Sequence, residues 1–233
     1  TYVGRGGGSN INPLSSGNFL LVHSSTGVPL GTSIRFTQPV NGIAFSPSGS
    51  AVAVGSQNRT VTSLGIPDRT ILKVYQGPYS SATTCAFAPD GTWFVTNGND
   101  DSGENDQFPR LWQVATGSNN RTFQYDTTAN TSSVVALSFD STLLCSSERS
   151  FPIWNVSNGT LVRHLFSGSE SSTGLAFSPT VQELAANAAI RDPITGATLR
   201  TLVGQVFRPT CFAYSGDGLL LAGGNSDNRV RLW

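Results

Sequence analysis

The amino-acid sequence predicts an all-β fold built from repeated four-stranded antiparallel units, and three observations carry this prediction. Short apolar runs at 51–54, 93–96 and 219–222 are bounded by Gly, Asn, Asp, Pro or Ser, which is typical of short strands joined by turns. The 25 glycines and 12 prolines are spread along the whole chain. No stretch therefore keeps the apolar period of a helix. The third observation is that two series of residues recur at regular intervals.

The first series marks the end of an apolar strand that runs into a turn containing Pro, Asp or Gly, as in Gly42–Gly49. Its members recur at intervals of 37 to 50 residues: Phe45, Phe87, Leu137, Phe177 and Tyr214. The second series precedes turns such as Val-Ala-Thr-Gly: Val22, Leu64, Trp112, Trp154, Arg191 and Trp233. Both series have their long interval at 99–106, so one shared insertion explains both.

This repeat predicts a β-propeller, because four strands in about 40–45 residues make one propeller blade. Four blades look complete, at about 40–76, 82–126, 133–166 and 173–203. Residues 11–37 add two or three strands and residues 209–233 add three, so about five to six blades are present. A self-closed ring and a fragment of a larger ring both stay open as interpretations.

Two segments are expected along the chain. Residues 1–17 form an N-terminal Gly-rich arm, and residues 18–233 form the propeller. Residues 1–3 are a candidate closing strand for the last blade, and the Gly-rich run at 4–8 has the composition of a flexible linker.

Over residues 18–233 the chain resembles the WD-repeat β-propeller family. The resemblance rests on first strands of the Ala-Phe-Ser-Pro type, on Arg-Leu-Trp at 110–112 and 231–233, and on Ile-Trp at 153–154. The Asp that should follow the Trp is Gln113 or Asn155, and the Gly-His pairs before the first strands are absent. The buried hydrogen-bond relay of the family therefore does not carry over. What the resemblance implies for function is protein–protein scaffolding.

The composition excludes several classes of function. Fourteen Lys and Arg balance fourteen Asp and Glu, so the chain lacks the basic field that non-specific binding of nucleic acids or anionic membranes requires. No apolar run approaches the roughly 18–20 residues of a membrane helix. No nucleophile elbow, paired-His metal motif or phosphate loop occurs. We therefore expect no enzyme, no cofactor, no nucleic-acid partner and no membrane insertion, with His23 and His164 as surface residues at strand ends.

The insertion at 98–107 is the one candidate metal site. Its carboxylate and amide oxygens are ligands that calcium prefers in a flexible loop: Asn99, Asp100, Asp101, Glu104 and Asp106. The spacing differs from that of an EF-hand loop, so a solvated acidic hairpin tip is the favoured interpretation. Elsewhere, Asp90, Asp140 and Asp217 occupy equivalent turn positions, which favours a turn role over catalysis. Cys85, Cys145 and Cys211 are expected to be buried thiols without disulfides.

Five Asn-X-Ser/Thr sequons are candidate glycosylation sites: Asn58, Asn120, Asn130, Asn155 and Asn158. Their number barely exceeds what the composition predicts by chance, but all fall at predicted turns or strand ends, where glycans are tolerated. The chain also has a single lysine, Lys73, and no methionine. These features favour an extracellular or cell-surface protein, with a cytoplasmic location as the alternative.

The leading functional hypothesis is a non-catalytic protein-interaction or structural propeller. It would act as an extracellular glycosylated scaffold or a self-assembling component, with another protein or other copies of itself as partner. The alternative is a carbohydrate-binding propeller lectin. Its sugar-stacking aromatics would be those outside the repeat register: Trp93, Tyr75, Tyr79 and Tyr125. The register itself predicts that Trp112 and Trp154 are buried, with an inner core made by Phe45, Phe87, Leu137 and Phe177.

Overall fold

A computed structural model of the chain describes residues 2–7, 17–76, 81–99, 108–124, 134–147, 150–166, 174–204 and 209–233. Within these ranges all regular elements are strands, 22 in number, and no helix is present. The chain divides into two compact units, Thr1–Thr122 and Phe123–Trp233. The predicted all-β fold is confirmed.

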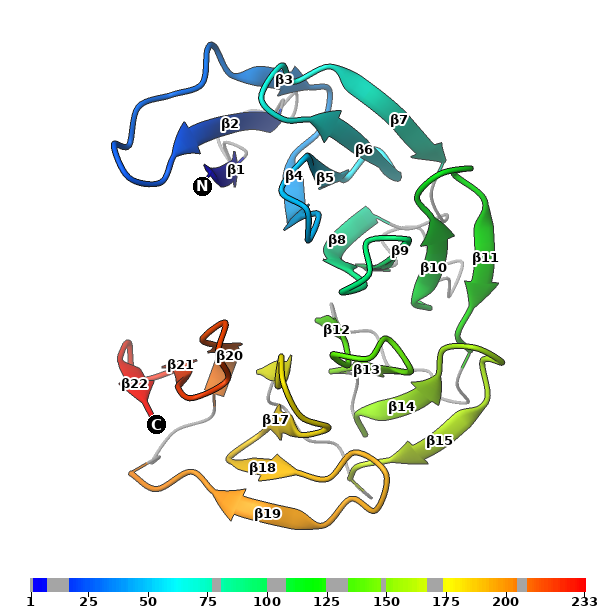
Figure 1. The fold of residues 1–233 in the computed structure, drawn as a ribbon, viewed down its shortest axis with the longest axis vertical. Coiled ribbons are helices and arrows are strands. Elements are labelled where there is room, and N and C mark those ends of the chain that lie inside the picture. The colour runs from blue at the N-terminus through cyan, green and yellow to red at the C-terminus, as the bar shows by residue number, and fades with distance from the viewer. Residues whose placement is uncertain are drawn as a thin grey trace. The chain divides into compact units, whose positions relative to one another are not determined.

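The first unit contains three sheets in which each strand pairs antiparallel with the next one along the chain (Figure 1). The first sheet consists of β1 (Tyr2–Gly7), β2 (Gly17–His23) and β3 (Ile34–Phe36). The second consists of β4 (Val40–Phe45), β5 (Ala51–Ser56), β6 (Thr60–Gly65) and β7 (Ile71–Gln76). The third consists of β8 (Ser81–Phe87), β9 (Trp93–Asn99), β10 (Arg110–Gln113) and β11 (Asn119–Thr122).

The second unit repeats this plan with three further sheets. The first consists of β12 (Val135–Leu137), β13 (Leu143–Ser146), β14 (Pro152–Asn155) and β15 (Leu161–His164). The next consists of β16 (Leu175–Phe177), β17 (Leu184–Ala186), β18 (Ala189–Arg191) and β19 (Thr198–Thr201). The last consists of β20 (Pro209–Tyr214), β21 (Leu221–Asn225) and β22 (Val230–Leu232).

The sheets match the predicted blades. The four four-stranded sheets lie at the four blades that the sequence marks as complete, and 209–233 forms a three-stranded sheet, as expected. All five residues of the first series are the last residues of first strands, namely those of β4, β8, β12, β16 and β20. The predicted propeller of four-stranded antiparallel blades is therefore confirmed in both the pairing and the register of its strands.

The N-terminal arm begins as a strand. β1 pairs with β2 from Tyr2 opposite His23 to Gly7 opposite Asn18, which makes it the first strand of the β1–β2–β3 sheet. Gly6 and Gly7 thus belong to a strand rather than to a flexible linker. Closure of the last blade by residues 1–3 stays a prediction.

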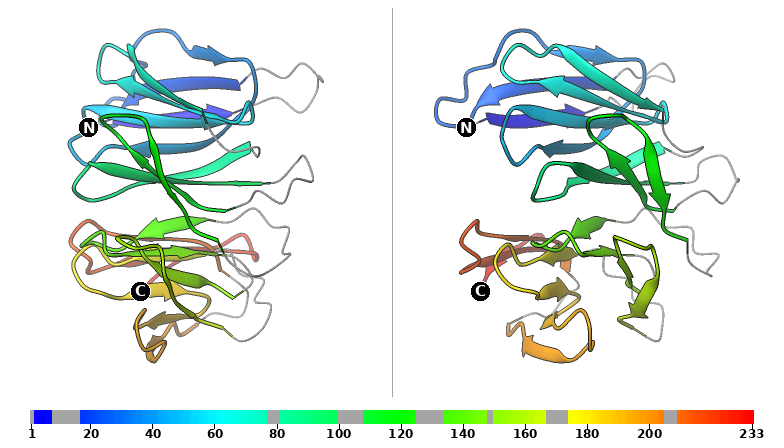
Figure 2. Two further views of the ribbon diagram at one scale, coloured as in Figure 1. Left: turned by 90° about the vertical axis from the view of Figure 1, so that its right-hand side faces the viewer. Right: turned by 45° about the vertical axis from the view of Figure 1, so that its right-hand side comes forward.

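In the first unit, successive sheets lie stacked on one another (Figure 2). Apolar side chains pack between them. Val52 and Val54 of β5 pack with Phe19 of the preceding sheet. Ala53, between them in sequence, belongs to the cluster on the other side, with Phe94 of the following sheet. Because successive strand residues point to opposite faces, β5 contributes to both cores.

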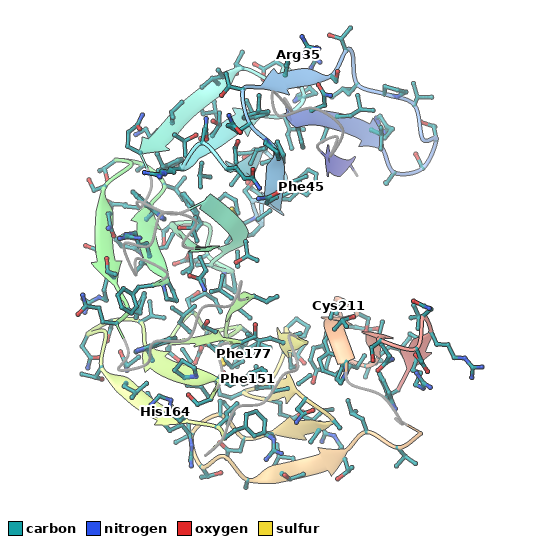
Figure 3. The ribbon with its side chains drawn as sticks, turned by 180° about the vertical axis from the view of Figure 1, so that it is seen from behind. Arg35, Phe45, Phe151, His164, Phe177 and Cys211 are labelled. Atoms are coloured by element: carbon teal, nitrogen blue, oxygen red, sulfur yellow. The ribbon has the colours of Figure 1, made fainter. Side chains whose placement is uncertain are left out.

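The second unit is built in the same way. Cys145, Phe151 and Ile153 pack with Phe177 in one cluster (Figure 3). Ala185, of the strand β17, packs with Phe212 of the last sheet in another cluster.

Burial confirms part of the predicted core. Trp112 is 3% exposed and Trp154 is fully buried, as the register requires, and Phe177 is buried as well. The prediction of an inner core is wrong for Phe45, Phe87 and Leu137, which are only half-buried. Each of the three ends the first strand of its sheet, which has a paired neighbour on one side only, and each is followed by a turn.

The thiols also differ from the expectation. Cys145 is buried and Cys85 is half-buried, but Cys211 on β20 is exposed, so the prediction of a buried thiol is wrong there (Figure 3). After its buried first residue, Pro209, strand β20 has two successive exposed residues, Thr210 and Cys211. Cys211 therefore does not fill the core that the neighbouring Phe212 enters.

Candidate interaction surfaces

In five of the six sheets described, the turn before the last strand has one geometry. The N–H groups of Gly27, Gly117, Gly159 and Gly196 each donate to the carbonyl oxygen four residues earlier, at 2.8 Å. All four glycines have positive φ, between 69° and 80°, a conformation that glycine adopts without steric cost. In the β4–β7 sheet, Arg69 takes this place with a φ of 61° and donates to Gly65 at 2.9 Å.

A cation from one blade lies across the turn of the next blade at two of these places. Lys73 Nζ donates to the carbonyl oxygen of Ala115 at 2.6 Å, and Arg163 Nη1 donates to that of Ile194 at 2.8 Å. A Cβ atom on Gly117 would lie 2.7 Å from Lys73 Cδ, and one on Gly196 would lie 2.7 Å from Arg163 Cζ. The missing side chain is thus what admits the cation, and the contact ties neighbouring blades together.

The same register position carries a cation in all four four-stranded sheets. This position is on the fourth strand, and its partner on the third strand is the last residue before a β-bulge. The four cations are Lys73, Arg121, Arg163 and Arg200. Sequence reasoning missed this series. Its signal is a basic residue four positions after the turn residue with positive φ.

The three turn aspartates satisfy their own turns, which confirms the predicted turn role. Asp140 Oδ1 accepts hydrogen bonds from Ser138 Oγ at 2.6 Å and from Thr142 N and Oγ1 at 3.1 and 2.8 Å. Asp90 accepts from Thr92 N and Oγ1, and Asp217 accepts from Ser215 Oγ and Leu219 N. A carboxylate that stabilises its own turn in this way is a structural group.

Replacing Asp140 by Ala is expected to lower the free energy of unfolding by about 1 kcal/mol at pH 7. Partial burial raises the pKa of this carboxyl, but hydrogen bonds from Ser138, Thr142 and Gln182 outweigh burial and hold the pKa below its usual value. The stabilisation is therefore present above the pKa of the unfolded chain and is lost as the pH falls through the lower folded-state pKa. Urea unfolding at pH 7 and pH 3 measures this, and an equal deficit at both pH values would contradict it.

The sequon asparagines use the same turn chemistry. Asn58 Oδ1 accepts from Thr60 N and Oγ1 at 3.1 and 2.6 Å, and Asn158 Oδ1 accepts from Thr160 N and Oγ1 at 2.9 and 2.8 Å. Asp68, Asp90 and Asp140 make the equivalent bonds to a Thr two residues on. The Asn-X-Thr pattern at these two sites is thus one form of an Asx-turn that Asp also fills.

The sequons also differ in accessibility. Asn58, Asn120 and Asn158 are exposed, Asn155 is half-buried, and Asn130 lies outside the described residues. Asn155 Oδ1 accepts hydrogen bonds from Ser157 N, Ser157 Oγ and Asn158 N. Its side chain is therefore less accessible than that of Asn158, three residues later.

The candidate calcium ligands Asp100, Asp101, Glu104 and Asp106 lie outside the described residues. Asn99 is the last residue of β9, opposite Ser81. Calcium binding by this loop stays a prediction. In the part of the chain that the structure describes, no group of three or more His, Cys, Asp or Glu side chains could hold a metal ion.

The remaining reactive groups are scattered. His23 is half-buried at the end of β2, and His164 is exposed at the end of β15, with its Nδ1 2.7 Å from Ser150 Oγ. Burial raises the pKa of the Cys85 thiol to about 12 and that of Cys145 well above its usual value. These two thiols are protonated at neutral pH and hence poor nucleophiles.

The aromatic residues proposed for sugar stacking differ in how far they are exposed. Tyr75 is buried, donates its hydroxyl to the Val114 carbonyl oxygen at 3.1 Å, and meets Phe94 edge-on. It has no free face to offer a sugar ring. Trp93 is half-buried, and Tyr79 and Tyr125 lie outside the described residues.

Two surface features remain as candidate interaction sites in the first unit. A pocket of about 420 Å³ lies between the β4–β7 and β8–β11 sheets, lined by side chains that include Lys73, Leu72 and Phe87. Strand β7 exposes three apolar side chains, with Ile71 65%, Leu72 55% and Val74 44% exposed. Leu72 belongs to both features, so the pocket and the apolar strand form one continuous surface. The described residues include no helix able to span a bilayer.

Comparison with known proteins agrees with this architecture. The family model "WD domain, G-beta repeat" matches residues 27–62, 69–126 and 196–233, together more than half of the chain. The chain is also similar to the Arabidopsis thaliana protein ROOT INITIATION DEFECTIVE 3, at 25% identity over 219 residues. The match covers 84% of this chain and 48% of that protein, so the chain spans about half the length of this curated relative. The resemblance that the sequence motifs indicate is thereby confirmed, and the chain belongs to the WD40 repeat family.

Proposed function

We propose that this chain is a non-catalytic protein-interaction propeller. WD40 propellers are typically scaffolds for protein partners, and the observation that carries the proposal here is the set of exposed apolar side chains on β7. Ile71, Leu72 and Val74 are all at least 44% exposed on one strand. Gathered apolar side chains of this kind mark surfaces that a partner buries.

The experiment compares the proteins that co-purify with the wild-type chain and with a double variant, Ile71→Ser and Val74→Ser. Both positions are exposed, so the fold should persist with little change in stability. Val203→Ser is the matched control, because Val203 is 82% exposed in the other unit. Partners should be recovered with the wild type and the control and lost with the double variant. Equal recovery with all three proteins would contradict a docking role for β7.

The finer proposal is an extracellular, glycosylated scaffold whose partner is another protein or other copies of the chain, with a cytoplasmic scaffold as the alternative. Its support is the exposure of Asn58, Asn120 and Asn158, since an N-glycan requires an accessible asparagine.

Native material should therefore lose mass when treated with an amidase that removes N-glycans. Peptide mapping should find Asn158 modified in preference to the half-buried Asn155. An unchanged mass would contradict the extracellular form and favour the cytoplasmic one.

A further inference from the structure

The pocket between the β4–β7 and β8–β11 sheets contains the only lysine of the chain. Lys73 reaches it from the fourth strand of one sheet, and Val114 and Ala115 close it from the third-to-fourth turn of the next sheet. The exposed residues Ser48 and Ser50 line the same space. The pocket therefore brings a cation to the protein surface.

Lys73 has bonding capacity to spare. Its ammonium group donates to the Ala115 carbonyl oxygen at 2.6 Å, which uses one of its three donor protons. The ion pairs found among the described residues join Arg200 to Glu183 and Arg231 to Asp227. Within the part of the chain that the structure describes, Lys73 thus has no carboxylate bound to it.

Of the two equivalent cations in the second unit, Arg163 and Arg200, the second does have one. Arg200 occupies the register position of Lys73 on its own fourth strand, and its guanidinium donates to the Glu183 carboxylate. Glu183 holds the same position in the β16–β19 sheet that Ala51 holds in the β4–β7 sheet. The carbonyl oxygens of Glu183 and Ala51 each accept from the serine that opens the preceding turn, Ser178 N and Ser46 N, at 2.9 Å.

The β4–β7 sheet therefore has the cation but carries the methyl group of Ala51, which lines the pocket, where the β16–β19 sheet carries the carboxylate. We propose that an acidic side chain of a protein partner enters this pocket and binds Lys73 as Glu183 binds Arg200. The inference rests on the proposed scaffold function, because it names the chemistry of a partner segment. A carboxylate on a lysine ammonium forms a charge-assisted hydrogen bond.

The other walls define the rest of the ligand. Phe87, Leu72 and Val114 supply apolar surface beside Lys73, so the acidic residue should be flanked by an apolar one. Asp90 also lines the pocket, with its carboxylate held by Thr92. Its negative charge disfavours a run of acidic residues, and the expected motif is a single acidic side chain between apolar neighbours.

A single lysine makes a direct experiment feasible. The protein is labelled with ¹³C at lysine Cε, which gives one signal from Lys73, and is titrated with the peptide Ser-Leu-Glu-Leu-Ser blocked at both ends. The Lys73 signal should shift and saturate. The same peptide with Gln in place of Glu should produce no saturable shift.

Two variants test whether the peptide binds at Lys73. Ala51→Glu supplies the missing carboxylate internally, so the Lys73 signal should already be shifted in the free protein and the peptide should shift it no further. By fluorescence anisotropy of a labelled peptide, Lys73→Gln should weaken binding about tenfold or more. Arg35→Gln is the matched control, because it removes one exposed positive charge from the same unit and should leave the affinity unchanged (Figure 3).

Three results would overturn the inference. Equal shifts with the Glu and Gln peptides would show that the carboxylate is not recognised. Saturation by a phosphoserine peptide but not by the Glu peptide would indicate a phosphate site instead. Unchanged peptide binding by Ala51→Glu would place the peptide elsewhere. None of these results decides the scaffold function, which the β7 double variant tests separately.

Discussion

Replacing Trp154 by Ala is expected to lower the free energy of unfolding by about 3–5 kcal/mol. The side chain is fully buried on β14, so its removal leaves a cavity that the surrounding strands can fill only in part. The ring also packs against Phe123 with centroids 5.8 Å apart, and Nε1 donates to the Gln124 carbonyl oxygen at 3.3 Å. Both contacts are lost in the variant.

Urea unfolding followed by circular dichroism measures this effect. Trp154→Phe keeps most of the ring packing and removes the hydrogen bond to Gln124, so it should fall between the wild type and Trp154→Ala. Val162→Ala is the control, because Val162 on the neighbouring strand β15 is 37% exposed. A Trp154→Ala variant no less stable than Val162→Ala would contradict the repeat register on which the blade assignment depends.

The strand and turn positions could be predicted because they follow from local chemistry. Phe45, Phe87, Leu137, Phe177 and Tyr214 each end a first strand, as the sequence intervals indicate. The turns after the third strands could be found because a glycine with positive φ is required at one fixed place, as at Gly117 and Gly159. These signals depend on residues within a few positions of one another, so no knowledge of the packing is needed to find them.

Depth in the core could not be predicted in the same way. Phe45 and Phe177 hold equivalent positions at the end of a first strand, but Phe45 is half-buried and Phe177 is buried. The sequence pattern around them is similar, so the difference arises from what the neighbouring sheets place against each ring. Cys211 and Phe212 show the same limit, since adjacent residues of one strand face in opposite directions and only Phe212 is buried.

The features of the Lys73 pocket could not be predicted from the sequence for a related reason. Lys73 and Ala115 are 42 residues apart and meet only because neighbouring blades pack together. The comparison of Ala51 with Glu183 also needs the strand register, because the turns that precede them differ in sequence. The sequons are the opposite case. Their pattern is easy to find, but Asp-X-Thr makes the same turn at Asp68 and Asp90, so the pattern alone does not separate a glycan acceptor from a turn.

In the first unit, Phe94→Ala is expected to have an effect as large as that of Trp154→Ala, about 3–5 kcal/mol. Phe94 is fully buried on β9, at the core that joins the β4–β7 and β8–β11 sheets. The centroid of its ring lies 4.7 Å from the ring centroid of Tyr75, 5.6 Å from that of Phe87 and 6.4 Å from that of Trp112. Each aromatic pair adds about 0.5–1.5 kcal/mol beyond the area that it buries, so the loss should lie toward the upper end of this range.

The same substitution tests whether this core supports the pocket. Phe87 and Tyr75 both line the pocket and both pack on Phe94, so they lose their common support when the ring is removed. Phe94→Ala should therefore shift the single Lys73 signal in the free protein and also lower the unfolding midpoint. Ile71→Ala, at a 65% exposed position on β7, should leave the midpoint close to that of the wild type. If Phe94→Ala behaved like Ile71→Ala in unfolding, the two sheets would not share the core described above, and the pocket between them would lose its structural basis.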